Sequence, residues 1–174
     1  MIGLPEFKKE YFEKFSTKQV LIKPYDPKSK VIAQEYVNKL KSLLEGFDFE
    51  IAHRGSTAFG ISGKGDIEIG VYPAENCWYQ LLEKLINHYK SVGCLENNYA
   101  RFNDVYDNFE IEVILMKGHE AIVDKKIARY LKEHPPLLKK YEKLKVESSF
   151  SKRNYQIQKD LFFRKIAKQI PDNY

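Results

Sequence analysis

The sequence predicts an α+β fold, in which a small mixed or antiparallel sheet is flanked by helices and followed by a helical C-terminal part. Three observations predict it. Two short apolar runs, 47–53 and 67–71, bracket a segment rich in Gly, Ser and Lys. Two further strand-like runs flank the turn residues Asp107 and Asn108. The last third has helical apolar spacing, and strands followed by a run of helices favour α+β over a long βαβ series.

Length and composition predict one domain over residues 1–174, with an N-terminal helical extension (1–19) and C-terminal helices (119–170). The 174 residues are 43% hydrophobic, enough for a proper core. The apolar runs are too short for a membrane span, and no signal-peptide core is visible, so we expect a cytoplasmic protein with no membrane partner. Two cysteines are too few for a disulfide framework. The net charge of +5 mildly favours anionic partners.

The elements of the first half follow from apolar spacing and turn residues. In order, we expect a helix over 5–15, a short β run over 20–22, a helix over 30–45, strands over 47–53 and 67–72, and a helix over 76–92. Pro24 and Pro27 stop the β run. Gly46 and Gly93 end the two longer helices, and Asn76 is the candidate N-cap of the second.

The second half begins with a hairpin and continues as helices. Its expected elements are strands over 99–105 and 109–116 and helices over 121–133, 137–146 and 153–169. His134 and the two prolines after it separate the first two helices. Apolar spacing predicts that Val31 of the helix over 30–45 and Leu161 of the last helix face the core.

The central motif joins a small turn to a pair of acids. Gly55 and Ser56 follow the first apolar run; glycine permits close backbone approach to a ligand, and serine adds a hydroxyl at a candidate helix N-terminus, where anions bind well. About ten residues later, Asp66 and Glu68 are two positions apart on a strand and face the same way. Paired carboxylates near such a turn suit Mg²⁺ and a polyphosphate. An ordinary turn and a polar strand face are the alternative.

A third carboxylate is expected from a neighbouring strand, because holding a second ion or acting as a base needs one more acid. The run 109–113 offers Glu110 and Glu112, which alternate with apolar residues. We favour Glu112 because it lies deeper in the run, with Glu110 as the second choice. For either residue the alternative is an ordinary solvent-facing strand position.

Cations beside the turn could neutralise phosphate charge. Arg54 and Lys64 flank it and are the candidate nucleotide-binding cations, with isolated surface charges as the alternative. His53 ends an apolar strand and is interpreted as a packed or capping residue rather than a base. No Walker-type phosphate loop, zinc pattern or Ser/His/Asp arrangement occurs in the sequence. Further basic residues that could line a nucleotide cleft are Arg101, Lys145 and Lys159.

Several segments resemble those of the GrpB-like proteins. Lys23–Pro27 resembles their PYDP segment, and His53–Ala58 resembles their HIGSTA segment. Gly60–Ile69 resembles the glycine, lysine and acid run that follows, and Tyr130–Pro135 resembles DYLRAHP. The last matching positions are Tyr141, Leu144, Lys145, Tyr155 and Lys159. The resemblance spans about residues 20–166.

That family looks like a branch of the nucleotidyltransferase superfamily, which implies a mixed sheet flanked by helices. The positions that match the superfamily pattern are Gly55, Ser56, Asp66 and Glu68. By analogy, Glu112 or Glu110 is the third acid. The resemblance implies transfer of a nucleoside monophosphate from a nucleoside triphosphate to an unknown acceptor, assisted by two Mg²⁺ ions, with Mn²⁺ as a substitute.

The chain also departs from the family pattern. Lys28 or Ser29 stands where a Trp is usual, the segment 58–66 is shorter and lacks the usual prolines, and glutamates at 110 and 112 replace a His-x-His. Two other functions stay open. One is a non-catalytic nucleotide-binding or interaction module with the same fold. The other is nucleic-acid binding through the basic C-terminal helices, which would weaken steeply with salt.

Overall fold

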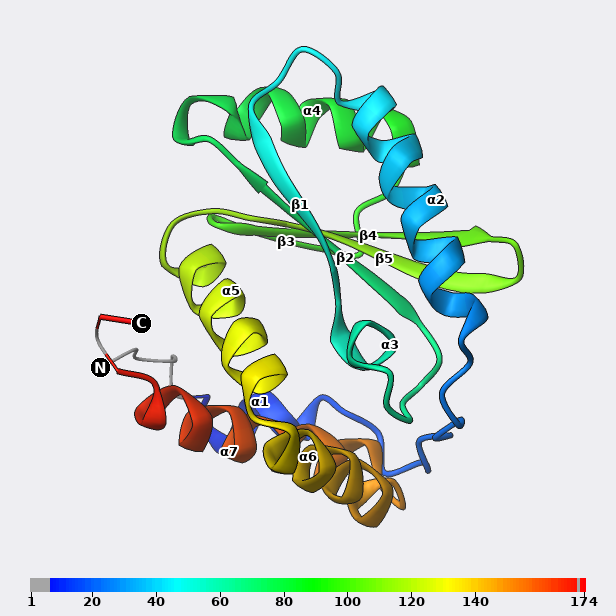
Figure 1. Ribbon diagram of the computed structural model, residues 1–174, viewed down its shortest axis with the longest axis vertical. Coiled ribbons are helices and arrows are strands. Elements are labelled where there is room, and N and C mark those ends of the chain that lie inside the picture. The colour runs from blue at the N-terminus through cyan, green and yellow to red at the C-terminus, as the bar shows by residue number, and fades with distance from the viewer. Residues whose placement is uncertain (1–6, 172) are drawn as a thin grey trace. The chain divides into compact units, whose positions relative to one another are not determined.

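A computed structural model describes residues 7–171, 173 and 174 (Figure 1). The chain divides into two compact units. The first, which we name the sheet unit, comprises residues 25–60 and 65–122. The second, the helical unit, comprises the described part of residues 1–24 together with 61–64 and 123–174. No helix in the described ranges is long and apolar enough to cross a bilayer.

The sheet unit is built on one mixed five-stranded sheet of order β1-β2-β5-β4-β3. Its strands are β1 (Phe49–Arg54), β2 (Ile67–Pro73), β3 (Cys94–Glu96), β4 (Tyr99–Tyr106) and β5 (Phe109–Met116). β2 and β5 are parallel, and every other neighbouring pair is antiparallel. The sheet with its helices confirms the α+β fold class and its mixed sheet.

One face of this sheet is apolar and carries the core. The helices α2 (Lys28–Leu43) and α4 (Trp78–Tyr89) cover it, and the short helix η1 (Glu75–Cys77) leads into α4 (Figure 1). Every second residue of β2 points into this layer, so the core includes Ile67, Ile69 and Val71, all fully buried.

The opposite face of the sheet is mixed. At one end, Tyr72, Ile114 and Met116 form a small apolar cluster with Ala121 of α5 (Gly118–Glu133), which begins in the sheet unit. The other end carries acidic and basic side chains. A sheet face that is not packed against the core can carry polar side chains, as this end does.

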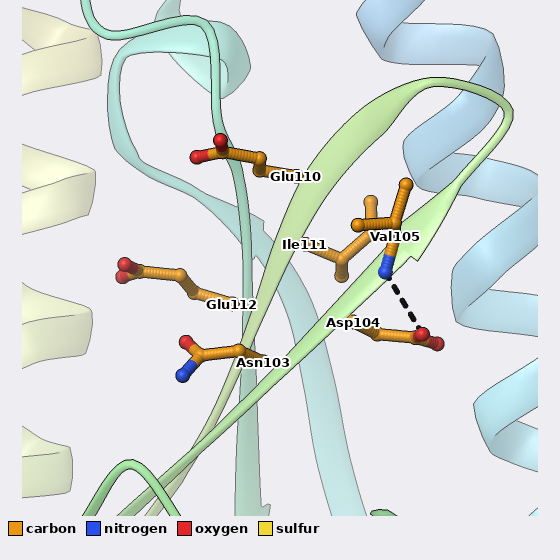
Figure 2. A pocket seen from close by; sticks show the side chains of 6 residues that line it. All are labelled: Asn103, Asp104, Val105, Glu110, Ile111 and Glu112. Carbon is orange, nitrogen blue, oxygen red and sulfur yellow. Dashed lines mark hydrogen bonds between the residues drawn. The ribbon is translucent and has the colours of Figure 1, made fainter.

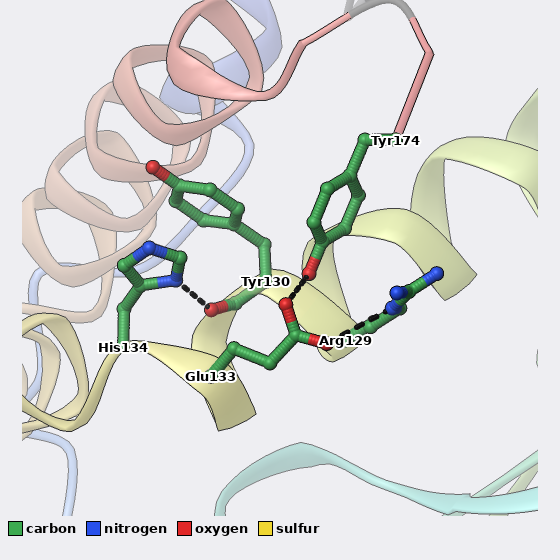
Figure 3. A network of polar contacts seen from close by, with 5 residues as sticks. All are labelled: Arg129, Tyr130, Glu133, His134 and Tyr174. Atoms are coloured by element: carbon green, nitrogen blue, oxygen red, sulfur yellow. Dashed lines mark hydrogen bonds and ion pairs between the residues drawn. The ribbon is translucent and has the colours of Figure 1, made fainter.

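The helical unit contains α1 (Lys9–Glu13), the rest of α5, α6 (Pro135–Ser148) and α7 (Lys152–Gln169). Its N-terminal segment is held by backbone hydrogen bonds between Val20 N and Ser149 O and between Lys152 N and Lys18 O, both 2.7 Å long. Around the end of α5, the ring of Tyr130 stacks on His134 (Figure 3).

The end of α5 also holds the last residue of the sequence. Glu133 accepts a hydrogen bond from the Tyr174 hydroxyl and pairs with Arg129, 3.0 Å away (Figure 3). These two partners lower the pKa of Glu133. The contacts are exposed, so they contribute little to stability.

The segment 61–64 is tied to α6. Glu142 accepts hydrogen bonds from the hydroxyl and the backbone N–H of Ser62, the latter 2.7 Å long, and fully buried Lys145 donates to the Ser62 carbonyl. Residue Gly63 pairs with Lys23 in an isolated bridge. The donors on Ser62 lower the pKa of Glu142 from its ordinary value of 4.5.

We expect Ser62→Ala to cost about 1 kcal/mol of stability at pH 7, the net contribution of one hydrogen bond. A carboxylate whose pKa falls on folding stabilises the protein above its ordinary pKa, and loses that contribution as the pH drops through the lowered value. The difference between wild type and variant should therefore shrink below pH 4.5. Urea unfolding from pH 7 to pH 3 measures it. The control is Ser149→Ala, whose hydroxyl donates to the Val146 carbonyl and should give a pH-independent difference.

Two expected elements of the first half are wrong or shifted. Residues 20–22 form no strand, because Val20 bonds to the end of α6 instead. Asn76 lies within η1, and the N-cap of α4 is Cys77. That helix ends at Tyr89, and its C-cap is Lys90, with a left-handed φ of 61°, and not Gly93.

Other expectations need smaller corrections. Val31 and Leu161 are 58% and 54% exposed, because the buried faces of α2 and α7 are centred on other residues. Part of the expected first helix, 5–6, lies outside the described residues. Strand β3 was not expected at all: it has three residues, too few to show a period.

Candidate metal centre

A line of four polar side chains crosses the mixed face of the sheet. The cross-strand register pairs Arg54 of β1 with Glu68 of β2, Glu68 with Glu112 of β5, and Glu112 with Asn103 of β4. Residues that are directly paired on neighbouring strands share a face. The register therefore places the second and third expected acids side by side, between an arginine and an amide.

Asp66, Glu68 and Glu112, which we name the acidic triad, converge at this point. One carboxylate oxygen from each lies within 4.8 Å of the other two. Asp66 immediately precedes β2 and is buried, at 6% exposure, while Glu68 and Glu112 are half-buried. Three carboxylates held this closely repel one another unless a cation lies among them.

Gly55 makes room for the triad. It adopts a φ of +72° at the start of α3 (Gly55–Phe59), and a Cβ added to it would lie 2.7 Å from Cδ of Glu68 and 2.8 Å from its Oε1. A side chain at position 55 would thus occupy the space of the Glu68 carboxylate. Ser56 is the next residue, half-buried in the first turn of α3. The turn between β1 and α3 therefore touches the acids directly.

A chain of hydrogen bonds fixes the start of β2 against this turn. Buried Thr57 donates from its hydroxyl to the backbone carbonyl of Asp66, 3.1 Å away. That hydroxyl has one proton, so it accepts from Nε2–H of His53, 2.9 Å away. His53 is therefore a positioning residue for the backbone of Asp66, in keeping with its interpretation as a packed or capping histidine.

The donor set of the triad fits Mg²⁺ or Mn²⁺. Both ions prefer carboxylate oxygens, and opposite ligands of one Mg²⁺ lie about 4.2 Å apart. The 4.8 Å within which the three oxygens lie is only slightly larger than that span. Because residue 55 is a glycine, the backbone approaches the Glu68 carboxylate without a side chain between them. These residues would hold the ion, and two of them, Glu68 and Glu112, are partly exposed to solvent.

Three further side chains lie on the same face of the sheet: Arg101, which the sequence analysis named only as a possible cleft residue, and Tyr99 and Tyr72, which it did not assign. Arg101 of β4 lies 3.9 Å from Oε1 of Glu112. Burial, with smaller contributions from Glu112 and Glu68, raises the pKa of Tyr99. The side chain of Tyr72 lies directly over Gly70, where a Cβ on residue 70 would collide with the Tyr72 hydroxyl. The position of Tyr72 follows from strand alternation, because it is four residues after Glu68 on the same strand. The positions of Arg101 and Tyr99 depend on the pairing of β4 with β5.

A pocket of about 530 Å³ opens on the hairpin beside the triad (Figure 2). Glu112 lines the pocket and is also a member of the acidic triad. The residues that line the pocket are Asn103, Asp104, Val105, Glu110, Ile111 and Glu112. In Figure 2 the side chains of Glu110, Glu112 and Asn103 extend to the same side of the hairpin. The second-choice acid, Glu110, thus lies in the pocket rather than in the triad.

Two of the candidate cations, Arg54 and Arg101, belong to the sheet unit, as does the triad. Arg54 is the cross-strand partner of Glu68, and its Cγ would lie 3.2 Å from a Cβ on Gly70. Lys64 is exposed and belongs to the helical unit, as do Lys145 and Lys159. Arg54 is therefore the candidate phosphate-binding cation of the sheet unit, and a role for Lys64 stays a prediction.

Two solved structures resemble this chain. One is the Cid1 poly(U) polymerase with Mg 3′-dATP bound, at 15% sequence identity and a TM-score of 0.40. The other is a cytoplasmic RNA terminal U-transferase, at 14% identity and a TM-score of 0.38. Each match covers 78% of this chain, but only 46% and 43% of the respective structure. The chain thus spans less than half the length of either protein.

Comparison with curated proteins gives no match. The GrpB protein family, by contrast, matches residues 19–169, which is most of the chain. This span contains the Gly55-Ser56 turn, the acidic triad and the C-terminal helices. The family resemblance noted in the sequence is confirmed: the chain belongs to the GrpB protein family.

Proposed function

We propose that this chain is a Mg²⁺-dependent nucleotidyltransferase, which moves a nucleoside monophosphate from a nucleoside triphosphate to an acceptor. The observation that carries the proposal is the convergence of Asp66, Glu68 and Glu112 within 4.8 Å, directly against the turn at Gly55. Positioning and charge neutralisation are most of what phosphoryl-type transfer requires of a protein.

Each residue has a role in this proposal. The acidic triad would hold Mg²⁺ or Mn²⁺, which neutralises charge on the phosphates and on the leaving group. Ser56 and the backbone of the Gly55-Ser56 turn bind the triphosphate, and Arg54 and Lys64 are the candidates for neutralising its charge. Arg101 balances part of the negative charge of Glu112, to which it lies close.

The transfer forms one bond and breaks one. The acceptor oxygen bonds to the α-phosphorus of the triphosphate, and the bond from that phosphorus to the β-phosphate oxygen breaks. Pyrophosphate leaves with the electron pair, and the acceptor proton passes to a carboxylate of the triad. Glu112 is the triad member nearest the pocket and therefore best supports this last role.

Asp66→Asn is expected to lower pyrophosphate release by at least about 100-fold, because the triad loses a buried anionic ligand. The assay incubates the protein with each nucleoside triphosphate, Mg²⁺ or Mn²⁺, and a deproteinised cell extract as the source of acceptor. Mn²⁺ binding, followed by electron paramagnetic resonance, should weaken in parallel. Glu83→Gln is the control, since Glu83 is an exposed acid on α4, which covers the other face of the sheet.

Other outcomes would point to the alternative functions. Tight nucleotide binding without pyrophosphate release would replace the transferase with a non-catalytic nucleotide-binding module. Retention of RNA or DNA that fades steeply with salt, and is unaffected by Asp66→Asn, would favour nucleic-acid binding through basic helices.

A further inference from the structure

The pocket beside the triad has the size of a small-molecule site. Its volume of about 530 Å³ lies within the range of about 300–1,000 Å³ that is typical for ligand sites. Glu112 forms part of its wall and is also a member of the triad. A molecule in the pocket would therefore lie next to the centre at which the proposed transfer takes place.

Two polar side chains of the pocket have no intramolecular role. Within the part of the chain that the structure describes, the side chains of Asn103 and Glu110 form no hydrogen bond or ion pair, and both residues are exposed. Asp104 differs, because its Oδ2 accepts from the Tyr36 hydroxyl at 2.6 Å and its Oδ1 from Val105 N at 2.8 Å. The amide and the Glu110 carboxylate are therefore available to a ligand.

The charges of the pocket favour a cation. Two of its six lining residues, Glu110 and Glu112, carry carboxylates on the side that Asn103 shares, a third acid, Asp104, extends to the other side of the hairpin, and none is basic (Figure 2). Arg101 lies near one of them, Glu112, at 3.9 Å, and is not part of the wall. A phosphate in this pocket would meet like charges, whereas an ammonium group would pair with Glu110.

The spacing along β5 limits the ligand further. Glu110 and Glu112 are two positions apart on one strand and face the same way, so their Cα atoms are about 7 Å apart. A molecule that pairs with one and presents a hydroxyl to the other must place its cationic and nucleophilic groups at roughly that separation. A sugar ring or a short amino alcohol is of this size.

We propose that the acceptor of the transfer is a small, amine-bearing hydroxyl compound, and not the 3′ end of a nucleic acid. This inference rests on the proposed nucleotidyl transfer. The ammonium group pairs with Glu110 and a ring hydroxyl bonds with Asn103, while a second hydroxyl lies at Glu112. Its oxygen bonds to the α-phosphorus, its proton passes to the Glu112 carboxylate, and pyrophosphate leaves.

Three probes built on the same sugar ring test the charge that the pocket prefers. Glucosamine carries an ammonium group, glucose is neutral, and glucose 6-phosphate is anionic. Each is titrated into the ¹⁵N-labelled full chain with Mg²⁺ present and no nucleotide, and the amide shifts of residues 103–112 are followed. We expect glucosamine to bind most tightly and glucose 6-phosphate least. Glu110→Gln should remove the preference for glucosamine, a loss of about three- to fivefold, while Glu83→Gln retains it.

The inference is overturned if glucosamine shows no advantage, if Glu110→Gln leaves the advantage intact, or if an oligoadenylate binds this pocket more tightly. Because this titration contains no nucleotide, it does not depend on turnover. Amine-selective binding without pyrophosphate release would contradict the proposed transferase function but support the inferred specificity of the pocket. Pyrophosphate release with an anionic or nucleic-acid acceptor would contradict the inferred amine-bearing acceptor but support the proposed transferase function.

Discussion

Replacing Gly55 with alanine should abolish Mn²⁺ binding and lower any pyrophosphate release by at least about 100-fold, as for loss of an essential charged group. The new methyl group would lie 2.7 Å from Cδ of Glu68, which is closer than two non-bonded carbon atoms approach each other. The carboxylate would have to swing away, and the triad would lose its arrangement. The left-handed φ of +72° adds a strain of about 1–2 kcal/mol.

A matched control separates the strain from the collision. Gly46 also has a left-handed φ, +90°, but a Cβ there would have no atom within 4 Å. Gly46→Ala should therefore lower the unfolding free energy by a similar amount and leave Mn²⁺ binding intact. Electron paramagnetic resonance on both variants, with unfolding curves for each, distinguishes the two effects. Equal loss of Mn²⁺ binding in both variants would show that Gly55 has no special relation to the site.

Phe102→Ala is expected to destabilise the sheet unit by about 3–5 kcal/mol. Phe102 is fully buried at the centre of β4, with its ring stacked on Tyr89 of α4 at a centroid distance of 5.3 Å. Removing it leaves a cavity between the sheet and the helices that cover it. Since single domains are stable by only about 5–15 kcal/mol, this loss is a large part of the free energy of unfolding.

The chain supplies its own probe for this measurement. Trp78 is the one tryptophan of the sequence and is buried in the same core, so its fluorescence reports unfolding of the sheet unit in urea. Phe102→Leu, which keeps most of the volume, should cost less than about 1.5 kcal/mol. Val105→Ala, on the same strand but 68% exposed, should change the free energy by about 0.5 kcal/mol or less. A similar loss for all three would argue against the core position of Phe102.

Strongly periodic segments were predictable from the sequence, and their ends were less so. The hairpin around Asp107 and Asn108 and the helices after residue 118 are present because local spacing and turn chemistry determine them. The run at 20–22 was misread because its backbone bonds to a segment distant in sequence. Val31 and Leu161 were misplaced because an apolar residue at the flank of a helix looks the same in sequence as one at its centre.

The sequence by itself determined which residues could form the site: a glycine and a serine after one strand, and acids two positions apart on the next. It favoured Glu112 as the third acid and kept Glu110 as the second choice, since both face the same way on β5. Only the tertiary structure shows which of them lies beside Glu68. The parallel register of β2 with β5 places Glu112, and not Glu110, opposite Glu68. Pairing between strands 44 residues apart depends on packing across the whole sheet, and no local pattern in the sequence encodes it.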